Sequence, residues 1–225
     1  MTGYRDLAAL IDRMPSPAKY ANIVNSTLDV LWVLYDRVLD VSPERIEDPD
    51  RDRFLLSKGH CPNAFYAVLA AKGFIEAAEL DKWGSFASRL GKHPDRVLLP
   101  GAEIGSGSLG HGLGLGVGTV LGLRAQGRTA PKVVVLVGDA EMDEGSNHEA
   151  IVLAGRLGLE QLTAVVVDNT SASHGWPGGI GARFALEGWA ERVVDGHDHT
   201  ALYEAFTQPH PGRPLVVVAQ VEPKN

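Results

Sequence analysis

Apolar positions in the first third of the chain recur at helical spacing. Between Lys19 and Leu39 they fall every three or four residues, which predicts one helix with a single buried stripe. The stripe consists of Ile23, Leu28, Leu31, Leu34, Tyr35 and Val38. The prolines and charges from Ser42 to Arg53 predict an exposed loop. Two more helices are expected, one from Pro62 to Lys72 that Gly73 ends and a short one near Glu76–Trp83.

Further along the chain the pattern becomes an alternation of strands and helices. A glycine-rich segment, Gly101–Gly127, continues into a helix. After it come three short β-branched runs that are apolar without alternation, as expected of parallel strands covered on both faces: Lys132–Val137, Leu162–Val167 and Pro214–Val221. Helical stretches lie between them, at Asn147–Leu157, roughly Ala182–Ala190 and Thr200–Phe206. This order predicts an α/β fold, with a doubly wound, mostly parallel sheet and helices on both faces.

Length and composition restrict the class of protein. At 225 residues we expect one domain, in which an N-terminal helical segment, residues 1–47, precedes an α/β core, residues 48–225. The formal net charge of −7 argues against a nucleic-acid-binding or membrane-surface protein, because both need a basic face. No apolar run is long enough to span a bilayer, and no signal-peptide pattern opens the chain. The single cysteine, Cys61, excludes an internal disulfide, so we expect a cytoplasmic protein.

Asp139 and Asn169 are the first candidates for chemistry. Each follows a predicted strand, and the carboxyl ends of neighbouring parallel strands share the edge where ligands bind. A carboxylate and an amide carbonyl are hard oxygen donors that suit Mg²⁺ or Ca²⁺. Both residue types also cap turns, so spacing alone leaves a metal site and two turn caps equally open.

The glycine-rich segment contains the pattern G-x-G-x-x-G at Gly105–Gly110. In a dinucleotide-binding fold this pattern follows a strand, and an acidic residue that binds the ribose stands about twenty residues later. Here the next acid is Asp139, so we favour a glycine-lined helix that packs closely on a sheet over nicotinamide binding. His60 and His93 lie in loops that border this segment and could reach a ligand there.

Six motifs in order carry the most specific signal. Two of them lie in loops, RDRFLLSKGH with His60 and GKHP with His93. Three follow in the α/β part, namely GSGSLGHG, GDAEMDEGSNHEA and VVVDNTSASHG, and the sixth is DGHD at Asp195–Asp198. Together they resemble the N-terminal, thiamine-diphosphate-binding (PP) section of transketolase from about Asp48 to Val221. In length the chain resembles the stand-alone subunit of a split transketolase.

The resemblance implies a cofactor site at the edge of the sheet. Asp139, Asn169 and the backbone carbonyl of Ser171 would hold Mg²⁺, which bridges the two phosphates of thiamine diphosphate. The other implied cofactor contacts are Gly138 and Ala140 at the diphosphate, and Gly107, Ser108 and Leu109 at the aminopyrimidine ring.

Three residues are implied to act in catalysis. His60 and His93 would contact the diphosphate and the donor hydroxyls and would relay protons. Glu144 corresponds to a family glutamate that belongs to both the catalytic and the cofactor-binding residues, in a carboxylate network linking paired active sites.

The same resemblance implies an incomplete active site. In the family, the glutamate that activates the cofactor and the aromatic wall beside its ring lie in a pyrimidine-binding (Pyr) domain. A C-terminal partner subunit would supply this domain here, in an α₂β₂ heterotetramer. The expected function is transfer of a two-carbon ketol unit from a ketose or ketose phosphate donor. The alternatives are a thiamine-diphosphate-dependent 2-oxo acid decarboxylase or acyl transferase subunit, and a non-catalytic scaffold.

Departures from the family pattern point away from a housekeeping sugar phosphate reaction. The family's early S-G-H is not seen, and the matching helix offers only Asn22 or Asn25, which transfer no protons. The second glycine of G-D-G is Ala140, and Thr170 stands where glycine is common. The usual extension after the last strand, with a sugar-contacting histidine, is absent. We therefore expect a specialised acyl or ketol transfer in a biosynthetic pathway.

Overall fold

The computed structural model describes residues 2–15 and 21–223, with side chains described from residue 27 onward in the second range. Within these residues five parallel strands form the central sheet: β1 Arg53–Leu56, β2 Val133–Gly138, β3 Leu162–Asp168, β4 Ala190–Asp195 and β5 Leu215–Gln220. Their order across the sheet is β1-β2-β3-β5-β4, and each neighbouring pair is parallel. The predicted parallel α/β class is confirmed.

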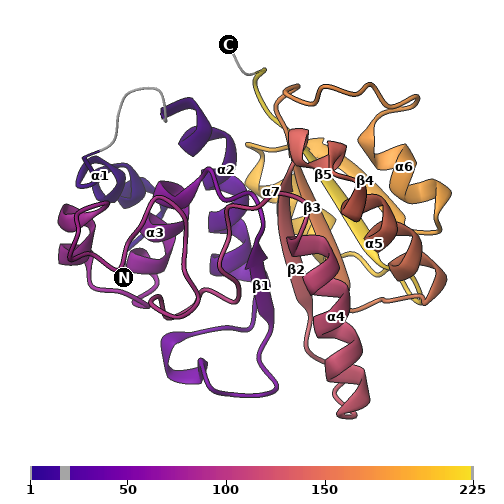
Figure 1. Ribbon diagram of the computed structural model, residues 1–225, viewed down its shortest axis with the longest axis horizontal. Coiled ribbons are helices and arrows are strands. Elements are labelled where there is room, and N and C mark those ends of the chain that lie inside the picture. The colour runs from indigo at the N-terminus through magenta and orange to yellow at the C-terminus, as the bar shows by residue number, and fades with distance from the viewer. Residues whose placement is uncertain (1, 16–20, 224–225) are drawn as a thin grey trace.

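Helices cover both faces of the sheet (Figure 1). One face carries α2 Ala21–Val33, α3 Pro62–Ala71 and α7 His199–Thr207, with α1 Leu7–Asp12 packed against α3. The other face carries α4 Gly112–Ala125, α5 Gly145–Arg156 and α6 Ile180–Leu186. The sheet is therefore doubly wound. No helix in the described ranges combines the length and the apolar content that a membrane span requires.

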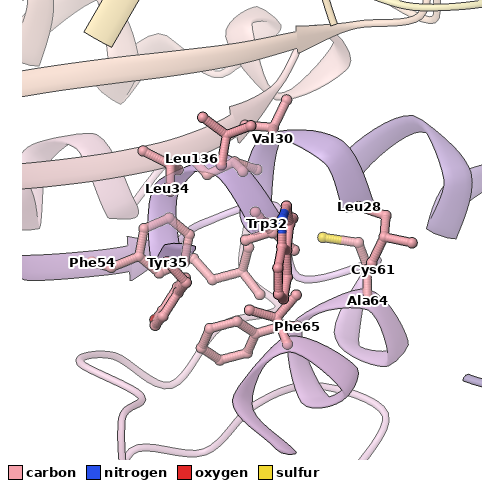
Figure 2. Packing of buried hydrophobic residues seen from close by; sticks show 14 of the residues in the cluster. Leu28, Val30, Trp32, Leu34, Tyr35, Phe54, Cys61, Ala64, Phe65 and Leu136 are labelled. Carbon is pink, nitrogen blue, oxygen red and sulfur yellow. The ribbon is translucent and has the colours of Figure 1, made fainter. Parts of the chain in front are cut away.

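Aromatic packing fills the first face (Figure 2). The ring of Tyr35 lies with its centroid 5.4 Å from that of Phe54 and 6.2 Å from that of Phe65. The predicted stripe is buried here, with Leu28, Leu31 and Leu34 in the core and Val38 partly buried against it. Each such side chain stabilises the fold by about 1.5–3 kcal/mol on burial, so the stripe holds α2 to the sheet.

The predicted helices of the first third are present with changed boundaries. The helix expected from Lys19 to Leu39 consists of α2 and the π-helical turn Leu34–Val38 that follows it. Lys19 lies outside the described residues, as do the side chains of Asn22, Ile23 and Asn25. The short helix expected near Glu76–Trp83 is a 3₁₀ helix, Ala77–Lys82.

Two strands correct the predictions. The loop expected from Ser42 does end at Arg53, but the strand that begins there, β1, was not predicted. Its four residues are too few to give a periodic pattern. The expected helix Ala182–Ala190 is wrong at its end, because α6 stops at Leu186 and Gly188, with a φ of +91°, turns the chain into β4. As an edge strand, β4 is less buried at alternate positions and so lacks the continuous apolarity of the central strands.

A polar cluster connects α2 to residues near both ends of the described chain. Asp29 of α2 is 8% exposed; its Oδ2 lies 2.7 Å from His197 Nδ1 and its Oδ1 lies 2.6 Å from His199 Nε2. The other ring nitrogen of His197 lies 2.8 Å from Glu222 Oε2. The ring of Tyr4 lies edge-on to that of His199, with centroids 4.7 Å apart. The cluster therefore ties together three segments that are distant in sequence.

This cluster predicts a pH-dependent contribution to stability. Burial lowers the pKa of His197, but hydrogen bonds to Asp29 and Glu222 outweigh it and leave the pKa raised. Stabilisation from a raised pKa is complete below the unfolded value of about 6.5 and is lost as pH rises through the folded value. His197→Asn should therefore destabilise the chain more at about pH 5.5 than at about pH 8.5 in urea unfolding. An equal loss at both values would contradict a role for the charge.

Candidate functional site

A cavity lies at the carboxyl ends of β2 and β3, beside the segment that follows β1. Its volume is about 250 Å³, and it is lined by Lys58, His60, Leu109, Gly138, Asp139, Ala140, Glu141, Asn169 and Ser171. β2 and β3 are paired neighbours, with Gly138 opposite Val167. Asp139 and Asn169 therefore leave the sheet side by side, at the edge where open α/β sheets bind ligands.

Asp139 holds the loop after β3 against the end of β2. It is 2% exposed. Its Oδ2 accepts hydrogen bonds from the backbone N–H groups of Ser171 and Ala172, the second at 3.0 Å, and its Oδ1 accepts one from Ser171 Oγ at 2.8 Å. Its side chain makes no capping hydrogen bond to the 3₁₀ helix Ala140–Asp143 that it precedes. The turn-cap interpretation is therefore wrong for Asp139.

Asp143, at the end of that 3₁₀ helix, extends the same attachment. Its Oδ2 accepts a hydrogen bond from the backbone N–H of Ser173 at 2.8 Å, and its Oδ1 accepts one from that of His174 at 3.4 Å. Two carboxylates from one short segment thus bind four successive backbone N–H groups, those of residues 171–174.

The side-chain oxygen of Asn169 is a hydrogen-bond acceptor without a donor. Its side chain is 7% exposed, and its Oδ1 is buried with no hydrogen-bond partner. The next residue, Thr170, has a φ of +57°, in the left-handed region that β-branched residues rarely adopt. Backbone strain of this kind gathers at ligand-binding sites, and glycine would adopt the same conformation without it.

The residues at this edge fit a small, hard cation. Leaving the buried Oδ1 of Asn169 unpaired is unfavourable, and a cation beside the carboxylate of Asp139 would satisfy it. One carboxylate, one amide and one backbone carbonyl suit Mg²⁺, which usually takes one or two carboxylates and completes its shell with phosphate oxygens and water. No group of three His, Cys, Asp or Glu side chains among the described residues is placed to hold a metal.

Glu141 lines the cavity although the sequence predicted no role for it. It is 1% exposed; its Oε1 accepts hydrogen bonds from Ser57 Oγ and from Gly110 N–H, the second at 2.9 Å. Its Oε2 accepts one from Gly138 N–H at 3.3 Å. Burial raises the pKa of Glu141, although these hydrogen bonds and the charge of Lys58 act in the opposite direction. The motif GDAEMDEG contains this residue, but only the fold reveals which segments it joins.

His60 and His93 come together beside the cavity. Their ring centroids are 5.6 Å apart, and His93 Nδ1 lies 2.9 Å from the carbonyl oxygen of Gly59. A Cβ on Gly59 would lie 2.9 Å from the backbone nitrogen of Gly107, so glycine is needed at position 59 for this close approach. His60 lines the cavity, whereas His93 is not among the lining residues.

The remaining predicted contacts are only partly at the cavity. Leu109 lines it, whereas Gly107, Ser108 and Glu144 do not. Glu144 is exposed, and its Cβ is packed so closely on Gly110 that a Cβ there would lie 2.6 Å away. The G-x-G-x-x-G pattern lies in the long segment between the 3₁₀ helix Ala77–Lys82 and α4, and no strand leads directly into it. This context differs from that of a dinucleotide fingerprint.

Comparison with known families identifies the fold and its motifs. Residues 23–220 match the family described as transketolase, thiamine diphosphate binding domain. The chain belongs to this family. Among solved structures, transketolase from Leishmania mexicana superposes with a TM-score of 0.79 at 25% identity, over 98% of this chain and 37% of that one. The transketolase fold thus accounts for the parallel sheet and both helix layers.

Two relatives of this transketolase-family chain have informative names. It is 41% identical over 144 residues to one subunit of the apulose-4-phosphate transketolase of Phocaeicola vulgatus, a match that covers 64% of this chain and 50% of that protein. It is 56% identical over 218 residues to a Rhodococcoides fascians protein named ferredoxin fas2, a match that covers 97% of this chain and 72% of that protein. The chain thus spans half the length of the Phocaeicola relative.

Residues 1–225 of this transketolase-family chain do not contain the ligands of an iron–sulfur cluster. Iron–sulfur clusters are held by several cysteine thiolates, usually four. The 225 residues contain one cysteine, Cys61, and burial raises the pKa of its thiol to about 11. A single buried, protonated thiol cannot hold such a cluster.

Proposed function

We propose that this chain is the thiamine-diphosphate-binding subunit of a two-component, transketolase-like enzyme, with residues 1–225 as one PP domain. Together with Mg²⁺ and a C-terminal Pyr-domain subunit, in an α₂β₂ heterotetramer, it transfers a two-carbon ketol unit from a ketose or ketose phosphate. We place the enzyme in the cytoplasm and its reaction in a specialised biosynthetic pathway.

The observation that carries this proposal is the pair of buried oxygen donors at the cavity. The carboxylate of Asp139 and the unpartnered Oδ1 of Asn169 leave adjacent strands at one edge, as a diphosphate-bound Mg²⁺ requires. The backbone carbonyl of Ser171 completes the protein's part of the shell. Gly138 and Ala140, which also line the cavity, let a diphosphate approach the backbone closely.

The other predicted residues have supporting roles in this proposal. When bound, thiamine diphosphate supplies a nucleophilic carbon that accepts the two-carbon unit. Gly107, Ser108 and Leu109 would contact its aminopyrimidine ring, while His60 and His93 would contact the diphosphate and the donor hydroxyls and would relay protons. Glu144, exposed beside Gly110, faces outward and joins the carboxylate network shared with the other subunits.

The relative from Phocaeicola vulgatus supports a separate partner, because its name describes one subunit of a transketolase. In this proposal the partner subunit supplies the Pyr domain's activating glutamate and aromatic wall, so we expect residues 1–225 to be inactive alone.

Titration calorimetry of thiamine diphosphate with Mg²⁺ tests the proposal, first on the chain alone and then with a co-expressed Pyr-domain subunit. We expect tight, Mg²⁺-dependent binding in the mixture and weak or no binding by the chain alone. A donor screen of the active mixture then separates a ketose donor from a 2-oxo acid donor. Absence of binding in both samples would contradict the proposal and favour the non-catalytic scaffold.

A further inference from the structure

Two oppositely charged side chains at the cavity have no role in the proposed cofactor site. Glu141 and Lys58 both line the cavity, with exposed fractions of 1% and 8%. Charged groups buried this deeply are rare unless an opposite charge compensates them, because removing a charge from water is unfavourable.

Glu141 connects three backbone segments around the cavity. Through Ser57 Oγ it holds the residue after β1, and through two N–H groups it holds Gly110, before α4, and Gly138, at the end of β2. Ser57 Oγ in turn accepts a hydrogen bond from Gly112 N–H at 3.0 Å. One carboxylate therefore sets the positions of the glycine segment and of the sheet edge relative to each other.

Lys58 lies over the same edge. A Cβ on Gly138 would meet the Lys58 side chain at its Cδ, 3.4 Å away, so the aliphatic stem covers the backbone of that glycine. The Nζ atom donates a hydrogen bond to Thr27 Oγ1 of α2 at 3.1 Å. Burial raises the pKa of Glu141, and the positive charge of Lys58 acts in the opposite direction.

Compensation is needed because of what the cavity is proposed to bind. A diphosphate is anionic, and Asp139 and Glu141 already place two carboxylates at the cavity. Asp139 and a diphosphate together carry at least three negative charges, so Mg²⁺ alone does not balance them. Glu141 adds a further negative charge at low dielectric, which Lys58 offsets.

We propose that Glu141 and Lys58 form a charge-compensated positioning pair, in which Glu141 fixes Gly110 and Gly138 and Lys58 cancels its charge toward the bound anion. The effect of the pair on cofactor binding rests on the proposed function, whereas its effect on the backbone does not. Neither residue takes part in the reaction. Glu141 acts by positioning the backbone, and Lys58 acts through the electrostatic field at the bound cofactor.

The variants Lys58→Met, Glu141→Gln and the double variant test the charge compensation, with Mg²⁺ and thiamine diphosphate as ligands and the partner subunit present. Lys58→Met should weaken cofactor binding about tenfold, because an uncompensated carboxylate then faces the diphosphate. The double variant should bind more tightly than Lys58→Met alone, since neither charge remains. Lys132→Met, which removes an exposed lysine at the opposite end of β2, is the matched control and should leave the affinity unchanged.

Hydrogen exchange of the chain without cofactor tests the positioning separately. Glu141→Gln replaces an acceptor oxygen by an NH₂ group facing N–H donors, so peptides containing Gly110 and Gly138 should exchange faster while those of β3 and β5 do not. Wild-type affinity in Lys58→Met, or a double variant weaker than Lys58→Met, would overturn the compensation. Unchanged exchange at both glycines would overturn the positioning. If even the wild type fails to bind thiamine diphosphate, the proposed function fails, whereas the exchange result still decides the role of Glu141.

Discussion

Asp139→Asn is expected to remove Mg²⁺-dependent binding of thiamine diphosphate while the sheet stays folded. The amide oxygen can still accept hydrogen bonds from the N–H groups of Ser171 and Ala172, and its nitrogen can donate to Ser171 Oγ, so the loop keeps its attachment. The metal, however, loses its only carboxylate in the proposed set. Changes in groups that merely support metal ligands weaken binding about 10- to 100-fold, so we expect a loss of at least about a hundredfold, measured by calorimetry.

Asp143→Asn is the matched control for this experiment. Asp143 binds the same loop through Ser173 and His174, but it does not line the cavity. Its replacement should change the affinity less than about threefold, and EDTA should abolish binding in the control as in the wild type. Equal affinities of wild type and Asp139→Asn would withdraw the metal assignment.

Gly116→Ala is expected to destabilise the fold, and Gly118→Ala, two residues further along α4, to stabilise it. A Cβ on Gly116 would lie 2.5 Å from Val135 Cγ2 and 3.2 Å from Leu162 Cδ1, both in the buried face of the sheet. The helix would have to move outward, at a loss of about 1–3 kcal/mol. At Gly118 the added Cβ would meet no atom outside the neighbouring backbone of α4 within 4 Å, so alanine should gain about 0.5–1 kcal/mol from helix propensity alone.

Urea unfolding of the two variants measures the difference between their free energies of unfolding. The two variants carry the same glycine-to-alanine substitution in the same helix, so they differ only in what surrounds the added Cβ. The comparison separates close packing from propensity, which a single variant cannot do. Similar shifts of the same sign in both variants would mean that α4 does not depend on the missing side chain at Gly116.

The sequence predicted those parts of the fold whose pattern is local. The continuous apolar runs around Val135, Val165 and Val217 belong to buried central strands, and the stripe on α2 belongs to the core. By contrast, β1 is too short to carry a period, and the alternating burial of β4 is typical of an edge strand. Neither strand has a pattern that distinguishes it from a loop or a helix end.

The candidate site likewise has one part that local sequence predicts and another part that it does not. Strand ends are local features, so the adjacency of Asp139 and Asn169 followed from the chain alone once the strands were taken as parallel. The function of Glu141 depends on Ser57 and Gly110, which are 84 and 31 residues away in sequence, and no local pattern contains that information. The catalytic and ligand roles of the predicted residues remain predictions.

The attachment of residues 171–174 to Asp139 and Asp143 also bears on how this enzyme family can diversify. Because four successive N–H groups are fixed at the start of the loop, its later part, residues 175–179, is mechanically separated from Asn169 and Ser171. Insertions and substitutions there therefore need not displace Asn169 and Ser171, the proposed metal ligands. The later part of this loop can therefore change in sequence and length while the edge of the sheet at β2 and β3 stays constant.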